Sequence, residues 1–219
     1  MQLKLSDKQF LEERAAAIAH EVKNPLTMVG FNLDILEASD ERPSADKNYA
    51  MIRKELKKIS DLMMDFLYLN SSYQGEEEPI IISDLLNKMA EDLRVSLPNV
   101  VLNITYPQDK IIITAGENSL RTLFGNIIKN ATEAMDYDGE IQITLEKIDN
   151  YAQVSFKDSG PGLSNDAQNK LFNEHFTTKP MGSGLGLSIC QKIAASLGGD
   201  FVLKNCDEGG CLAVVRFGV

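Results

Sequence analysis

Two series of apolar residues in the first third of this 219-residue chain recur mostly every three or four positions, at 11–36 and at 49–73. Such spacing places one narrow apolar stripe along each of two helices, as in a coiled-coil seam. The segment 37–46, EASDERPSAD, holds proline, serine and charges and is the expected connection. Because one such hairpin has too little to pack against alone, the pattern predicts a homodimer with a four-helix bundle.

The periodicity changes after a polar linker at residues 70–79, NSSYQGEEEP, where we place the boundary between domains 1–75 and 76–219. Strands are predicted at 79–83, 100–106, 110–114, 200–205 and 211–218, and two more over 140–158 with a turn at Asp149–Asn150. Helices are predicted over 117–136 and 184–199. Hairpin strands interspersed with helices predict an α+β fold with helices layered on one face of a mixed sheet.

Composition narrows the function classes. A formal net charge of −10 argues against a nucleic-acid partner, although a few local donors can still hold a nucleotide. The three cysteines show no metal-type spacing, which predicts reduced, buried thiols in a cytoplasmic protein. No run of eighteen apolar residues occurs, so we expect no membrane segment in this chain.

His20 lies in AAIAHEVKNPLTMV (16–29), off the apolar seam and facing away from the bundle core. An isolated histidine of this kind is most often a surface residue without function. The nearby Pro25 favours a functional role for His20 instead, because a proline in a helix interior costs about 3 kcal/mol and bends or loosens the helix. A neutral imidazole beside Glu21 is a good nucleophile, since the carboxylate can accept the second ring proton. We therefore expect His20 to attack a terminal phosphate.

The predicted helix at 117–136 carries a polar stripe that points to the nucleotide. Asn126, Lys129, Asn130 and Glu133 lie at i, i+3, i+4 and i+7, with apolar residues on the opposite side. Most such stripes are simply solvated faces. Asparagine is a poor helix former, however, so two of them one turn apart need a reason. Side-chain amides can complete a Mg²⁺ shell, and a lysine neutralises phosphate charge.

Two glycine-rich turns are weaker indications of a nucleotide site. DSGPGL (158–163) closes a strand with Asp158, which can accept from an exocyclic amine such as that of adenine, while its glycines let the backbone approach the ring. GSGLGLSI (182–189) opens a helix whose free amides suit an anion. Between them, LFNEHFTTKP (171–180) is predicted to form a lid that offers Lys179 to a phosphate, with His175 as a structural residue.

Together these stretches resemble the catalytic core of a two-component sensor histidine kinase, most closely the sporulation and nitrogen-regulation style. Five boxes occur in family order over nearly the whole chain: HEVKNPL (20–26) is similar to the histidine box, NIIKNATEA (126–134) to the asparagine box, DSGPG (158–162) to the first glycine box, LFNEHFTTK (171–179) to the phenylalanine box and GSGLGLS (182–188) to the second glycine box. One departure is EHF in place of the family's frequent EPF.

The resemblance implies a dimerisation and phosphoacceptor bundle at about 6–73 and a two-layer α/β sandwich ATP-binding domain of the Bergerat type at about 79–219. It implies ATP and Mg²⁺ as cofactors and a response-regulator receiver domain as partner. By the family pattern His20 is the phosphoacceptor, Glu21 its orienting base, and Asn24 positions water when the regulator is dephosphorylated. Asn130 holds Mg²⁺ and Asp158 reads adenine. The other implied nucleotide contacts are Asn126, Lys129, Gly160, Gly162, Thr178, Lys179, Gly182, Gly184, Leu185 and Gly186.

Other activities on the same ATP-binding fold make different demands on the sequence. Gyrase-like, mismatch-repair and chaperone ATPases carry a water-activating glutamate four residues before the metal-binding asparagine; that position is Asn126 here, which favours a kinase over a hydrolase. A non-enzymatic phosphorelay bundle with a degenerate ATP domain is disfavoured by the intact asparagine and glycine boxes. A serine kinase acting as an anti-sigma factor lacks a phosphoacceptor helix pair, so the histidine box argues against that class.

Overall fold

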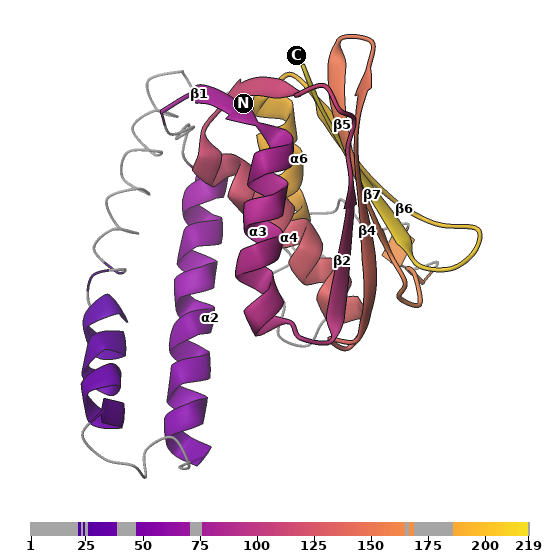
Figure 1. Ribbon diagram of the computed structural model, residues 1–219. Coiled ribbons are helices and arrows are strands. Elements are labelled where there is room, and N and C mark those ends of the chain that lie inside the picture. Colours follow the sequence, from indigo (N-terminus) through magenta and orange to yellow (C-terminus); the bar gives the residue numbers. More distant parts are fainter. Residues whose placement is uncertain are drawn as a thin grey trace, which may run out of the picture. The chain divides into compact units, whose positions relative to one another are not determined.

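The computed structural model in Figure 1 describes Val22, Asn24 and residues 26–38, 47–70, 76–164, 167–168 and 186–218. The chain forms two compact units, Met1–Tyr73 and Gln74–Val219. Within the described ranges, no helix combines the length and the apolarity that crossing a bilayer demands.

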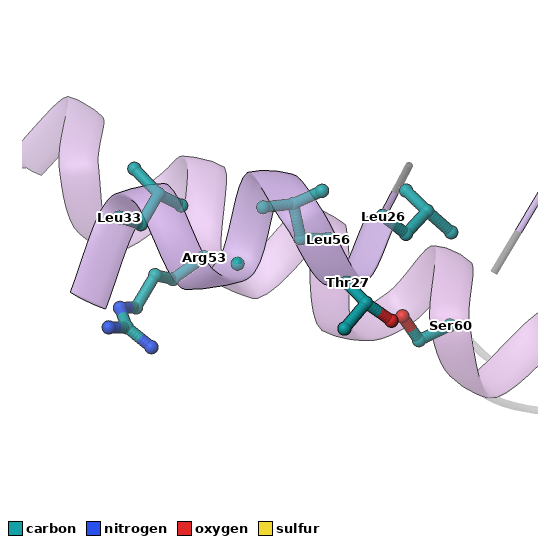
Figure 2. Close-up of a pocket in the computed structure, with 7 residues that line it drawn as sticks. Leu26, Thr27, Leu33, Arg53, Leu56 and Ser60 are labelled. Carbon is teal, nitrogen blue, oxygen red and sulfur yellow. The ribbon is translucent and has the colours of Figure 1, made fainter. Parts of the chain in front are cut away.

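The first unit is a helical hairpin, formed by the helical residues 26–38 and by α2 (Lys47–Asn70). Polar contacts hold its two arms in register: the Tyr49 hydroxyl donates to the carbonyl of Leu33 at 2.5 Å, and Arg53 pairs with both Asp34 and Glu37. Leu33 is buried between the arms. Tyr49 near the start of α2 contacts Leu33, whereas Ser60 further along α2 lies beside Thr27 nearer the start of the first arm (Figure 2), so the two arms run antiparallel.

The second unit is built around a mixed five-stranded sheet with the order β2-β4-β5-β7-β6. Its strands are β2 (Val100–Thr105), β4 (Gly139–Ile148), β5 (Tyr151–Asp158), β6 (Asp200–Asn205) and β7 (Cys211–Gly218). The pair β2–β4 is parallel and the other pairs are antiparallel. A separate antiparallel pair is formed by β1 (Glu78–Ile81) and β3 (Ile112–Ala115).

Three helices cover one face of this sheet (Figure 1): α3 (Ile82–Ser96), α4 (Glu117–Ala134) and α6 (Gly186–Ser196). The central strands alternate, so that every second side chain is buried on the helix side: Ile141, Ile143, Leu145, Ala152, Val154, Phe156, Ala213, Val215 and Phe217. Phe124 of α4 anchors this core, with its ring centre 5.6 Å from that of Phe156 and 6.2 Å from that of Phe217. Asp158 closes the buried series on β5, which places a carboxylate under the helices.

The α+β prediction is confirmed: a helical unit precedes a two-layer unit of helices on a mixed sheet. The hairpin turn at Asp149–Asn150 is also confirmed, with Asp149 in the left-handed region at a φ of 54°. The strand predicted at 79–83 is wrong beyond Ile81, because α3 begins at Ile82, and this helix was not predicted. The predicted connection at 37–46 begins too early, since residues 37 and 38 are helical.

Candidate functional site

The two asparagines in the middle of α4 face the first residue of α6. A methyl group placed on Gly186 would lie 3.9 Å from the side-chain amides of both Asn126 and Asn130. The Nδ2 atom of Asn126 is buried and has no hydrogen-bond partner among the described residues. Because a buried amide without a partner costs free energy, this donor suits an incoming acceptor oxygen. The N-terminus of the eleven-residue α6 favours the same kind of ligand, an anion.

The far end of α4 meets the 158–163 turn. A methyl group on Gly160 would lie 3.3 Å from Met135 Cγ and 3.6 Å from the carbonyl oxygen of Ala134. Ala134 lies eight positions after Asn126 along the helix, a rise of about 12 Å. One side of α4 therefore offers an amide pair at one position and a glycine turn two helical turns further on. This spacing fits a nucleotide with its phosphates at the first position and its base at the second.

Asp158 is held in place by backbone N–H groups from two segments. Its Oδ1 accepts from Gly160 N–H at 2.9 Å and from Cys211 N–H at 3.1 Å, and the residue is only 7% exposed. No hydrogen bond from the described residues reaches its Oδ2. The carboxylate thus keeps one anchored oxygen and one that can accept from a ligand donor.

The hairpin between β6 and β7 packs against Asp158, a contact that the sequence analysis missed. A methyl group on Gly210 would lie 2.0 Å from the backbone oxygen of Asp158, so only glycine fits. Burial, and after it the Asp158 carboxylate, raises the pKa of the Cys211 thiol to about 11, so this sulfur stays protonated at neutral pH. In the sequence, the glycines 209 and 210 between two predicted strands signal a turn. Nothing in that signal shows that the turn reaches β5.

Gly210→Ala tests this close packing, with Gly209→Ala as its matched control. Both glycines have a positive φ, but a methyl group on Gly209 meets nothing within 4 Å. We expect Gly209→Ala to lower the free energy of unfolding by about 1–2 kcal/mol, from backbone strain alone. In Gly210→Ala the new methyl group also overlaps the backbone of Asp158, so the free energy of unfolding should fall by about 3–5 kcal/mol. Urea denaturation of the second unit measures both, and equal losses would contradict the packing.

The first unit contains an open groove between its two arms, shown in Figure 2. It has a volume of about 250 Å³ and is lined by Leu26, Thr27, Gly30, Leu33, Arg53, Leu56 and Ser60. The Thr27 and Ser60 hydroxyls point toward one another across it (Figure 2). A methyl group on Gly30 would meet nothing within 4 Å, so the groove is open at this residue.

The structure brings only part of the predicted site residues together. Asn126, Asn130 and Gly186 form one cluster, and Asp158 and Gly160 lie together at the end of α4. Gly162, at a φ of +78°, sits against the side chain of Asn205, and Lys129 is exposed on α4. Asn24 is exposed on the first helical arm. The remaining predicted residues lie outside the described ranges: His20, Glu21, Thr178, Lys179, Gly182, Gly184 and Leu185.

Two family models match the chain. Residues 10–75 match the His Kinase A (phospho-acceptor) domain. Residues 115–219 match the family described as Histidine kinase-, DNA gyrase B-, and HSP90-like ATPase. The first match falls mainly on the helical hairpin and the second on the larger part of the sheet-containing unit.

Similar proteins carry the two parts in a longer chain. Sporulation kinase C of Bacillus subtilis is 31% identical over 207 residues, which cover 93% of this chain and 48% of the relative. Adaptive-response sensory kinase SasA of Synechocystis sp. is 31% identical over 207 residues, which cover 86% of this chain and 54% of the relative. The chain therefore spans about half the length of these curated relatives.

Solved structures show the same architecture. The histidine kinase ThkA in complex with the response regulator protein TrrA is 25% identical with a TM-score of 0.67, over 96% of this chain and 62% of that one. Full-length ShkA in complex with AMPPNP is 24% identical with a TM-score of 0.77, over 94% of this chain and 46% of that one. The second likeness establishes the fold alone.

Proposed function

This chain belongs to the sensor histidine kinases, and on that premise we propose that it transfers the terminal phosphoryl group of ATP to His20 and then to an aspartate of a response-regulator receiver domain. Domain 1–75 carries the phosphoacceptor and the dimer interface, and domain 76–219 binds ATP with Mg²⁺. The observation that most supports this is the buried Nδ2 of Asn126, an orphaned donor beside the start of α6.

At the phosphate end, Asn130 offers its Oδ1 to Mg²⁺, and Asn126 donates from Nδ2 to a phosphate oxygen. Lys129, exposed on the same helix, neutralises phosphate charge. Mg²⁺ held there would offset the negative charge that develops on the phosphates during transfer. The first amides of α6, from Gly186 onward, favour the same anion. Further contacts come from residues that the sequence alone assigns: Thr178, Lys179, Gly182, Gly184 and Leu185.

At the base end, Asp158 accepts a hydrogen bond from the 6-amino group of adenine. Its Oδ1 is already anchored by two backbone N–H groups, so Oδ2 is the acceptor that faces the ligand. Gly160 and Gly162 shape the turn beside the purine ring: a methyl group on Gly160 would lie 3.0 Å from Asp158 Oδ1, and one on Gly162 would lie 3.1 Å from Asn205 Oδ1. A carboxylate with one fixed oxygen rejects bases that have a carbonyl at this position.

At the phosphoacceptor, a ring nitrogen of His20 forms a bond to the γ-phosphorus while the bond from that phosphorus to the bridging oxygen breaks, leaving ADP. Glu21 orients the ring and accepts its second proton, which raises the nucleophilicity of the imidazole. The phosphoramidate then passes its phosphoryl group to the regulator's aspartate. Asn24 lies one turn beyond His20 and positions water when the same surface dephosphorylates the regulator.

The residue at position 126 supports phosphotransfer over hydrolysis. An amide nitrogen cannot accept a proton from water, whereas a carboxylate there could. With Asn126 in this place, the γ-phosphate lacks the water-activating base of the related ATPases and waits for an incoming nucleophile. The imidazole of His20 supplies it.

The groove in the helical hairpin is the proposed docking surface for the receiver domain. It lies on the flank of the hairpin that bears Thr27, Gly30 and Arg53. His20 precedes Thr27 by seven positions, so the helix predicted from the sequence would present it toward the same flank. Further apolar side chains, Met28 and Phe31, are 59% and 58% exposed on the face of the first arm that turns away from α2. The solved complex of ThkA with TrrA supports a response regulator as the occupant.

The opposite flank of the hairpin is apolar and supports a homodimer. Val29 and Leu36 are one heptad apart on the first arm, and Ile52 and Ile59 are one heptad apart on α2. They are 43%, 54%, 49% and 41% exposed, and antiparallel geometry puts all four on one side of the hairpin. Exposed apolar side chains at heptad spacing indicate a facing helix pair. A second copy of the chain supplies this pair.

Ile52→Glu is expected to convert the dimer to a monomer. The substitution buries an unpaired carboxylate in the four-helix bundle, which should weaken dimerisation by about 100-fold or more. Ala50→Glu is the matched control, because Ala50 is exposed and lies nearly opposite Ile52 around α2. Light scattering across a dilution series measures both variants. A monomeric wild-type chain, or a dimer unaffected by Ile52→Glu, would contradict this interface.

The experiment that tests the proposed function uses the whole chain with Mg²⁺ and ATP labelled at the γ-phosphate. We expect an acid-labile, alkali-stable phosphoprotein, since these are the properties of a phosphoramidate. A receiver domain added next should remove the label and hold it as an acyl phosphate on aspartate. Binding of ATP without any labelling would leave a phosphorelay bundle as the alternative. An acid-stable label would point to the serine-kinase class.

A further inference from the structure

Asn205, at the end of β6, holds the far end of the glycine turn at 158–163. Its Oδ1 accepts from Leu163 N–H at 2.7 Å, and its Nδ2 donates to Leu163 C=O at 2.9 Å. The amide therefore pairs with both polar groups of one residue, as a neighbouring strand would. Gly162 makes this approach possible, because a methyl group there would lie 3.1 Å from Asn205 Oδ1.

The strand partner of Asn205 is Cys211, which holds the other end of the same turn. The two residues face each other in the antiparallel pair β6–β7. Cys211 donates its backbone N–H to Asp158 Oδ1 at 3.1 Å, and its thiol lies 3.6 Å from Asn205 Oδ1. One pair of residues in the hairpin thus fixes both Asp158 and Leu163, the first and last residues of the turn.

We propose that Asn205 is a positioning residue for adenine recognition: by clamping Leu163 it sets the shape of the turn and thereby the direction of Asp158 Oδ2. This inference rests on the proposed function, in which Asp158 accepts from the adenine amine. Gly160 N–H anchors Asp158 Oδ1 from within the turn, so a displacement of the Leu163 end is transmitted to the carboxylate. Asn205 itself does not touch the base.

The test compares binding of ADP and of inosine diphosphate to the whole chain by titration calorimetry with Mg²⁺. Inosine carries a carbonyl in place of the 6-amino group and gains nothing from Asp158. Asn205→Leu keeps the side-chain volume and removes both hydrogen bonds to Leu163. We expect this variant to lose ADP affinity by about tenfold or more and to keep its inosine diphosphate affinity within about twofold. The variant should therefore lose most of the preference for ADP over inosine diphosphate.

Asn87→Leu is the matched control. Asn87 of α3 is also half-buried and also joins two segments, through a hydrogen bond to the Tyr106 hydroxyl of 3.2 Å just beyond the edge strand β2. Its loss should leave both affinities unchanged. Asn205→Asp keeps the volume and the acceptor but removes the donor to Leu163, so it should also lower the preference for ADP. If Asn205→Leu does not fold, the two nucleotide affinities of Asn205→Asp test the positioning role.

Each outcome separates this inference from the proposed function. A wild-type chain that binds neither nucleotide contradicts the proposed function itself, and this inference with it. A wild type that prefers ADP, with the preference intact in both Asn205 variants, overturns only the positioning role. Equal weakening of ADP and inosine diphosphate in the variants also overturns it, because a purely structural clamp would not distinguish the two bases.

Discussion

A His20→Gln chain is expected to bind ADP as well as the wild type and to take up no phosphoryl label from ATP. Glutamine keeps a polar side chain at a position that the sequence predicts to face away from the bundle core, so folding should be little affected. Its amide nitrogen lacks the free lone pair of a neutral imidazole and cannot attack phosphorus. The rate of labelling should fall by about a thousandfold or more, as for other lost nucleophiles.

The chain carries its own control for this experiment, because its two histidines are His20 and His175. His175→Gln should keep the label, since that histidine is expected to be structural. Calorimetry with ADP on both variants separates phosphotransfer from nucleotide binding. Undiminished labelling of His20→Gln, or its loss in His175→Gln alone, would assign the phosphoacceptor elsewhere.

Asn130→Leu should give the complementary result, a chain that neither binds Mg·ATP nor becomes labelled. Leucine fills the same volume but removes the oxygen proposed as the Mg²⁺ ligand. Mutation of residues that only hydrogen-bond to metal ligands commonly lowers metal affinity by about 10–100-fold. Loss of a direct ligand should therefore lower the affinity by at least the upper end of that range. Titration of the nucleotide with and without Mg²⁺ measures the effect, which should be much larger when Mg²⁺ is present.

Asn118→Leu controls for the change of residue type on the same helix. Asn118 is exposed in the first turn of α4 and lies twelve positions, about 18 Å of helix, before Asn130. Nucleotide binding should be unchanged in this variant. If Asn130→Leu retained the wild-type response to Mg²⁺, the metal would be held by other residues and the assignment of the asparagine box would need revision.

Much of the fold could be predicted because its elements follow local rules. The stripe of apolar residues on α4 and the alternation along β4 and β5 need only the helical and strand periods to be recognised. The start of α3 could not be found in this way. Ile80, Ile81 and Ile82 form one continuous apolar run, and such a run does not distinguish a strand from the first turn of a buried helix. The structure divides the run between β1 and α3.

The residues of the candidate site also fall into two groups, those that local motifs predict and those that only the folded structure shows. Asn126, Asn130 and Asp158 stand in short motifs whose chemistry can be interpreted from neighbouring residues. Gly210 and Asn205 act on the 158–163 turn from more than forty positions further along the chain, through one close backbone approach and one pair of hydrogen bonds. Periodicity and local motifs carry no information on such distant contacts, so only the folded structure reveals them.

The most direct test of the central claim is the location of the transferred phosphoryl group. After reaction of the whole chain with Mg·ATP, fragments kept at neutral to alkaline pH and analysed by mass spectrometry should show one added phosphate, on the fragment that contains His20. Fragmentation should place it on the imidazole. Phosphate found on a serine, threonine or aspartate, or on His175, would contradict the account.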